Sequence, residues 1–138
     1  MLKLISPEWE QRVVDQFHFN QLGRKPPEFL WETLPHAREP KLDCGGVQIN
    51  DKLYIFGGLL LGGDVVRMVD IFDLQKNRWV DRFKMPEGMA ETHLGVANDG
   101  ERYVYLISGQ LGKNCSPATA NNFILDTKTN GWMSLPLL

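Results

Sequence analysis

The sequence contains little cysteine and no excess of one charge. Its two cysteines, Cys44 and Cys115, are too few for a disulfide framework, so we expect two free thiols in a reducing compartment. Lysine and arginine total 15 and the acidic residues 17, which leaves a net charge of −2. That balance gives no electrostatic reason to expect nucleic acid or an acidic membrane surface as a partner.

Long hydrophobic runs are absent too. The longest weakly polar stretch, residues 53–63, is short and interrupted by glycines, so we expect no membrane insertion within this chain. The N-terminus turns polar at Ser6 and lacks the apolar core of a signal peptide. A cytoplasmic location is therefore the default expectation.

Two similar units occupy most of the chain. Each has an apolar strand that ends in glycine, a second strand after a loop, and a tryptophan seven residues beyond an apolar residue of that strand. The landmarks are Gly57, Gly58, Phe72 and Trp79 in the first unit, and Gly109, Leu125 and Trp132 in the second. Gly58 and Gly109 lie 51 residues apart, and the two tryptophans lie 53 apart. This period predicts a solenoid or a propeller, and short β-rich segments between turns favour four-stranded propeller blades.

On these landmarks the chain resembles the kelch-repeat family. The matching features are the diglycine after the apolar strand and the spacing from an apolar residue to the tryptophan. The chain is also similar to plant proteins of the galactose oxidase/kelch superfamily, notably in residues 69–71, 85–86, 89–90 and 93–95. The resemblance covers about residues 30–138, although Ser108 and Gly109 replace the diglycine in the second unit. It implies a β-propeller, with the secretory pathway or Golgi as an alternative location of a full-length parent.

The predicted fold class is all-β, with two complete four-stranded blades, part of a third, and a short N-terminal helix. Trp9, Val13 and Phe17 form one face of a helix over residues 7–18, which would cap a blade or dock a partner. The predicted organisation is a helix and linker over 1–28 and a partial propeller over 29–138, comprising a blade tail over 29–35 and blades over 44–83 and 93–135. The predicted strands are 45–49, 53–58, 68–73 and 78–83, then 94–97, 102–108, 122–126 and 131–135.

Two blades cannot close a ring, since propellers have about four to eight. We therefore expect a partial propeller with apolar end faces that meet further blades or a second copy. The alternative is a small stand-alone β-domain. Trp79 and Trp132 should be buried between neighbouring blades. Asp70, Asp73 and Asp126 should accept hydrogen bonds from turn backbone rather than act as acids.

The loops between second and third strands, residues 59–67 and 110–119, should emerge on one face, because they occupy the same place in each repeat. Binding residues concentrate on loops held by a rigid scaffold. His93 lies at one mouth of the expected channel, although an ordinary solvated histidine is the alternative interpretation. The candidate binding residues are Asp64, Arg67, His93, Gln110, Lys113 and Asn114. Asn114 also begins an N-glycosylation acceptor motif, which matters only in the secretory pathway.

No catalytic, metal or cofactor site is predicted. Enzymes like galactose oxidase hold copper with histidines, a tyrosine and a tyrosine cross-linked to cysteine. The candidate groups are poorly placed here: the tyrosines, Tyr54, Tyr103 and Tyr105, lie within apolar strands, and His18 lies outside the repeats. The sequence therefore predicts a non-catalytic interaction module with a protein partner. The alternative is part of a carbohydrate-active enzyme, either galactose-oxidase-like or a sugar epimerase or mutarotase.

Overall fold

The computed structural model describes residues 33–114 and 116–137. The chain divides into two units, Met1–Thr33 and Leu34–Leu138, and both blades lie in the second. The predicted N-terminal helix over 7–18 and most of the predicted blade tail lie outside the described residues. Across the part of the chain that the structure describes, no helix is long and apolar enough to cross a membrane.

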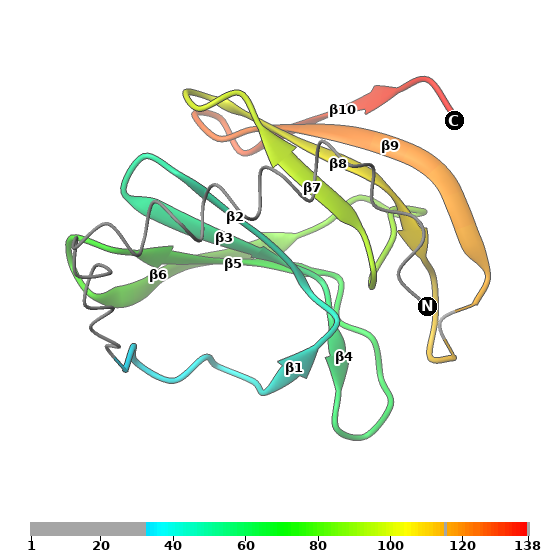
Figure 1. Cartoon of the computed structure of the whole chain (residues 1–138), viewed down its shortest axis with the longest axis horizontal. Helices are drawn as coiled ribbons and strands as arrows, with labels where there is room; N and C mark the ends of the chain where they lie inside the picture. The colour runs from blue at the N-terminus through cyan, green and yellow to red at the C-terminus, as the bar shows by residue number, and fades with distance from the viewer. Residues whose placement is uncertain (1–32, 115, 138) are drawn as a thin grey trace, which may run out of the picture. The chain divides into compact units, whose positions relative to one another are not determined.

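The first blade is a four-stranded antiparallel sheet with the strand order β2-β3-β5-β6 (Figure 1). Its strands are β2 (Gly45–Ile49), β3 (Lys52–Phe56), β5 (Met68–Asp73) and β6 (Arg78–Lys84). Asn50 makes the tight turn from β2 to β3 possible, because it adopts a φ of 52°, a left-handed conformation that asparagine tolerates well. The four strands agree closely with the prediction.

The second blade repeats this arrangement with β7 (Gly95–Asn98), β8 (Tyr103–Gln110), β9 (Ala118–Asp126) and β10 (Gly131–Leu135). The carboxylate of Asp99 holds the turn before β8, since it accepts hydrogen bonds from three successive backbone amides, those of Glu101, Arg102 and Tyr103. β9 begins four residues earlier than predicted, because its pairing with β8 resumes beyond a bulge between Ile107 and Gly109. The predicted all-β fold of two four-stranded blades is confirmed.

A short two-stranded ribbon accompanies the first blade and was not predicted. β1 (Lys41–Leu42) pairs antiparallel with β4 (Leu59–Leu60), which follows the diglycine. The ribbon thereby fixes the segment that enters the first blade to the loop that leaves β3. Leu42 and Leu61 stay exposed on this ribbon and at its tip.

The core lies between the two blades. Val104, Leu106 and Leu125 of the second blade belong to one buried cluster with Tyr54, Phe56, Val69 and Ile71 of the first. The inner strands also meet, since the Asn98 side-chain amide donates to the carbonyl oxygen of Gln48 across 3.1 Å. Met85, Met89 and Ala90, in the connection between the blades, complete the cluster.

The two repeat tryptophans are half-buried rather than fully buried. Trp132 does lean from the second blade onto the first, where its ring lies 6.5 Å from Phe56 and 6.4 Å from Phe83. Trp79 instead packs edge-on against Phe72 of its own blade at 5.2 Å. Its indole N–H donates to the carbonyl oxygen of Pro35 across 3.2 Å.

The diglycine holds the junction between the blades. A Cβ atom on Gly57 would lie 2.1 Å from the carbonyl oxygen of Glu91, and the φ of Gly57 is 62°. The amide of Gly58 donates to the same carbonyl oxygen across 2.7 Å. Both the space and the backbone conformation therefore require glycine at position 57. Ser108 stands at the equivalent position of the second blade with a φ of 49°.

The prediction that three aspartates accept hydrogen bonds from turn backbone is right for two of them and wrong for the third. Asp73 and Asp126 accept hydrogen bonds from the backbone amides of Lys76 and Lys128, as predicted. Asp70 was predicted wrongly: it lies within β5, buried, and its carboxylate accepts a hydrogen bond from the ammonium of Lys41 across 2.7 Å. The outward face of the first blade therefore carries a buried ion pair and is not purely apolar, contrary to expectation.

Candidate functional site

The candidate site is the end of the blades at which β3 and β8 finish, and we call it the loop face. Two loops form it, residues 61–67 after β4 and the described residues 111–114 and 116–117 after β8. The ammonium of Lys113 pairs with the carboxylate of Asp64, so the loops of the two blades touch. Both of these side chains are well exposed, with 64% of each accessible to solvent.

The carboxylate of Glu91 also links the same two loops. The Arg67 guanidinium donates to Oε1 of Glu91 through two nitrogens, at 2.7 and 3.0 Å. The amide of Gly112 donates to Oε2 of the same carboxylate across 3.0 Å. The Glu91 side chain is only 5% exposed, whereas that of Arg67 is 43% exposed. One buried carboxylate therefore holds a loop of each blade, and hydrogen bonds to a charged group are the stronger kind.

Glu91 was not among the predicted site residues. The sequence shows it only as an acidic residue shortly before an inner strand, which is not a signal of any role. The backbone of Glu91 explains its fixed position, because its amide donates to Gln110 and its carbonyl oxygen accepts from Gly58. A carboxylate so anchored can act as a fixed acceptor for both loops.

His93 contacts Asp43, the residue near the equivalent position of the first blade. Nε2 of His93 lies 3.7 Å from Oδ2 of Asp43, and the His93 amide donates to the Asp43 carbonyl oxygen across 3.1 Å. The two residues lie 50 positions apart, each before the inner strand of its blade, and both have left-handed φ values, 53° and 55°. Asp43 could have been found from the repeat period. Aspartate and histidine adopt this conformation more readily than most non-glycine residues.

The remaining predicted residues lie differently. Gln110 ends β8, and its backbone amide and carbonyl oxygen bond to Thr92 and Glu91. Oε1 of Gln110 and Oγ1 of Thr92 are buried without a hydrogen-bond partner among the described residues. Asn114 is exposed on the second loop. The structure thus brings Asp64, Arg67 and Lys113 together, whereas Gln110 is half-buried and its Oε1 is buried.

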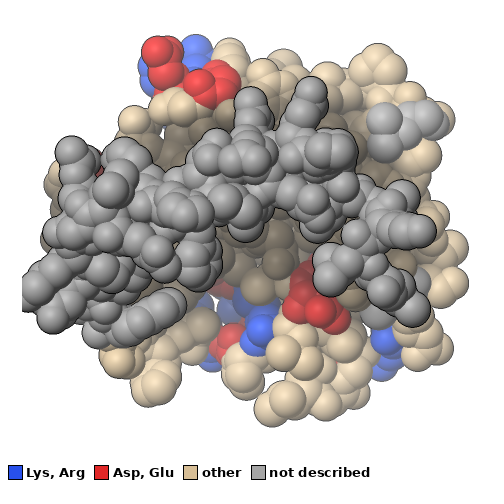
Figure 2. Space-filling model, in the orientation of Figure 1, with Lys and Arg blue, Asp and Glu red and all other residues tan. Residues whose placement is uncertain are grey.

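The charges visible on the face drawn in Figure 2 are mixed. Acidic and basic side chains lie in small adjacent groups in the view of Figure 2, without a broad field of one sign. This agrees with the small net charge of −2. Among the described residues, no group of three or more histidine, cysteine, aspartate or glutamate side chains is placed to hold a metal ion.

Comparison with known proteins gives one consistent answer. The kelch motif family matches residues 40–82, which cover β1 to β5 and most of β6. The chain is 46% identical over 112 residues to a kelch repeat-containing protein of Arabidopsis thaliana. The chain is a kelch-repeat protein. The match extends over 81% of the chain and 26% of the Arabidopsis protein.

More distant kelch relatives also match. Kelch-like protein 34 of Homo sapiens is 29% identical over 117 residues, which cover 81% of the chain and 18% of that protein. The kelch repeat and BTB domain-containing protein 1 of Ectromelia virus is 28% identical over 80 residues, covering 58% of the chain and 14% of the viral protein. The matched part of the chain therefore spans about a quarter or less of the length of these relatives.

Proposed function

We propose that the chain acts as a non-catalytic protein-interaction module and that the loop face binds the partner. The observation that carries the proposal is the double link between loops of different blades, Asp64 to Lys113 and Arg67 to Gly112 through Glu91. A surface that is already ordered loses less conformational entropy when it binds. His93 and Asn114 extend this surface on the exposed side.

The charged groups that converge on the loop face are paired with one another. Such an arrangement suits a polar recognition surface, where charges set orientation and specificity. General acid–base chemistry instead needs a titratable group that can reach a substrate proton. The pairing therefore favours binding over the carbohydrate-active alternative. Further blades of a longer parent, or a second copy of the chain, would extend the same surface.

A charge swap tests the proposal. In the variant Asp64→Lys with Lys113→Asp, the loops can still pair, but the charges presented to a partner are exchanged. The matched control is Asp81→Lys with Lys84→Asp, which exchanges two exposed charges on β6. Affinity capture from cells that express the parent protein would compare the wild type with both variants.

We expect the loop-face swap to lose captured proteins that the wild type and the β6 swap both retain. Identical sets from all three proteins would contradict a role for the loop face. Failure of the full-length parent to capture any protein, together with turnover of a carbohydrate substrate, would overturn the interaction function itself.

A further inference from the structure

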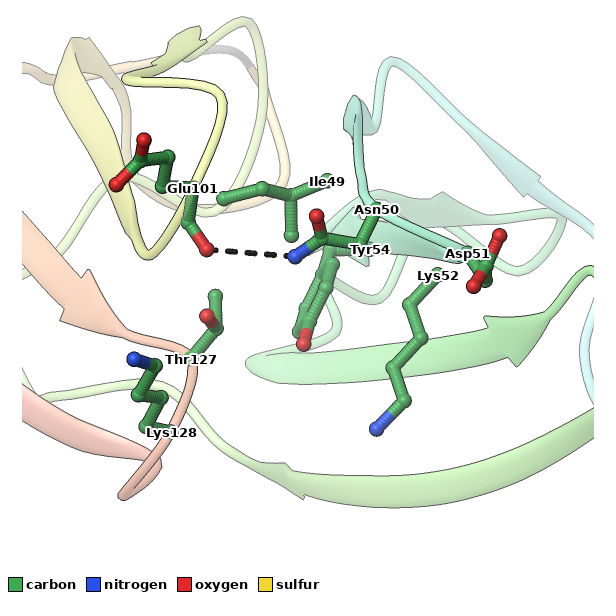
Figure 3. Close-up of a pocket in the computed structure, with 8 residues that line it drawn as sticks. All are labelled: Ile49, Asn50, Asp51, Lys52, Tyr54, Glu101, Thr127 and Lys128. Carbon is green, nitrogen blue, oxygen red and sulfur yellow. Dashed lines mark hydrogen bonds between the residues drawn. The ribbon is translucent and has the colours of Figure 1, made fainter.

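A second site lies between the blades at the opposite end of the strands. A pocket of about 220 Å³ opens between the β2–β3 turn of the first blade and two turns of the second (Figure 3). Its lining residues are Ile49, Asn50, Asp51, Lys52, Tyr54, Glu101, Thr127 and Lys128. β3 runs from Lys52 at this pocket to Phe56 beside the loop face, so the two sites are separated by the length of a strand.

Two hydrogen bonds tie the walls of the pocket together, one across the blades and one within the second blade. The side-chain amide of Asn50 donates to the carbonyl oxygen of Glu101 across 3.3 Å, the contact drawn in Figure 3. The hydroxyl of Thr127 donates to the carbonyl oxygen of Arg102 across 2.7 Å. These two hydrogen bonds fix the positions of the turns, so the pocket is part of the folded structure.

The tyrosine at the centre of the pocket is a hydrogen-bond donor. Only 2% of Tyr54 is exposed, and its hydroxyl points toward Thr127 (Figure 3). The Thr127 hydroxyl donates its proton to the Arg102 carbonyl oxygen, so the proton between Tyr54 and Thr127 is that of Tyr54, and a ligand would receive it in place of the Thr127 oxygen. Burial raises the pKa of the Tyr54 phenol, so the group stays protonated at neutral pH.

Four charged residues line the pocket, two basic and two acidic. Lys52 and Lys128 line two sides, and neither makes an ion pair within the described residues, where Lys41, Lys76 and Lys113 are the paired lysines. The Asp51 carboxylate is held by the Gln75 amide across 2.7 Å. The carboxylates of Asp51 and Glu101 lie on the outer sides, away from the Tyr54 hydroxyl (Figure 3). Long lysine side chains can swing over the pocket, whereas the held Asp51 carboxylate cannot.

We propose that this pocket receives one carboxylate side chain, an aspartate or a glutamate, from a partner protein. The Tyr54 hydroxyl would donate to the carboxylate, and the two ammonium groups would close over it. A volume of 220 Å³ holds about seven waters at ~30 Å³ each, less than the ~300 Å³ at which small-molecule sites begin. A single side chain fits that space. This inference takes from the proposed function only that the partner is a protein. The pocket itself lies at the end of the blades opposite the loop face.

Two blocked tripeptides, Gly-Glu-Gly and Gly-Gln-Gly, serve as probes in an NMR titration of the full chain. The glutamate peptide should shift the amide signals of Asn50, Thr127 and Lys128 saturably, whereas the glutamine peptide should not. Lys52→Met or Lys128→Met should weaken this binding about two- to fivefold, the range of an exposed ion pair. Lys84→Met, an exposed lysine on β6, is the matched control and should leave it unchanged.

Tyr54→Phe keeps the buried ring and removes only the hydroxyl, so it separates the donor from the fold. It should weaken glutamate-peptide binding while the spectrum of the core stays unchanged. Equal shifts with both peptides would overturn the proposal. Undiminished binding of the glutamate peptide by the double variant Lys52→Met with Lys128→Met would overturn it too. Binding of free acetate without binding of the peptide would overturn it as well, in favour of a small-acid site. The Asp64→Lys with Lys113→Asp variant should not affect this titration. A failure of the loop face to bind a partner can therefore be distinguished from a failure of the pocket to bind a carboxylate.

Discussion

Asp70 of the first blade and Phe123 of the second hold equivalent positions in the two repeats. Asp70 pairs with Ile55 on the neighbouring strand, and Phe123 pairs with Leu106 in the same way. Phe123 packs in the core between the blades, while the buried Asp70 binds Lys41. Arg82 Nε lies 3.4 Å from the other oxygen of Asp70 and extends the charged cluster. The first blade thus replaces an apolar contact by a buried ion pair on its outward face.

Lys41→Met should destabilise the chain by about 3–5 kcal/mol, because it leaves the buried Asp70 carboxylate without its nearest partner. Adding Asp70→Leu should recover most of this loss, since a well-packed apolar pair can replace a buried ion pair at little cost. Urea denaturation would measure both variants. Lys84→Met should change the free energy of unfolding by less than about 0.5 kcal/mol. If Lys41→Met were as stable as the wild type, Arg82 or solvent would be sufficient to compensate the Asp70 carboxylate.

The stability of the fold should depend on pH through the carboxylate of Asp126. The Arg102 guanidinium donates to both Asp126 oxygens, at 2.6 and 2.8 Å, and these bonds hold the pKa of Asp126 well below its ordinary value. Because the folded-state pKa is the lower one, the stabilisation is fully present above pH ~4 and is lost as pH falls toward the folded pKa. Asp126→Asn should therefore be less stable than the wild type at neutral pH, with the difference shrinking in acid. Glu87→Gln, at an exposed site, should show no such convergence.

Gly57→Ala should destabilise the chain by about 3 kcal/mol, because it combines a strained backbone with a collision against the Glu91 carbonyl oxygen. Gly62→Ala is the matched control, since a Cβ atom at that position would meet no atom within 4 Å and the φ of Gly62 is not left-handed. Thermal unfolding of the two variants would give the comparison. Similar melting temperatures would mean that the junction can shift to admit a side chain.

The eight blade strands could be predicted from the sequence because the repeat supplies each landmark twice. Turn residues such as Asn50 and Asp99 bound the strands, and Trp79 and Trp132 mark their last members. The period also fixes which residues are equivalent, so the face between the blades follows once one blade is read correctly. Where the two repeats agree, local pattern and global fold give the same answer.

The polar contacts could not be predicted in the same way. The pairing of Lys41 with Asp70 and of Arg67 with Glu91 joins residues that have no equivalent pair in the other repeat. Their formation depends on the exact approach of β1 and of the inter-blade connection, which no local pattern encodes. The pocket at Tyr54 likewise exists only because turns from both blades meet there. The sequence shows Tyr54 as one apolar-strand residue among several.

Glu91→Gln should loosen both loops of the loop face at once, because one carboxylate accepts from Arg67 and from Gly112. A glutamine keeps the shape but loses the charge and one of the two acceptor oxygens. We expect hydrogen exchange at the Gly112 amide to accelerate, and exchange in the β4–β5 loop to accelerate with it. Arg67→Met is the informative comparison, since it removes the link to the first loop while the Gly112 bond to Glu91 can persist. If Arg67→Met accelerated exchange at Gly112 as much as Glu91→Gln does, the two loops would be coupled through Arg67 itself, and Glu91 would not be the element that orders them.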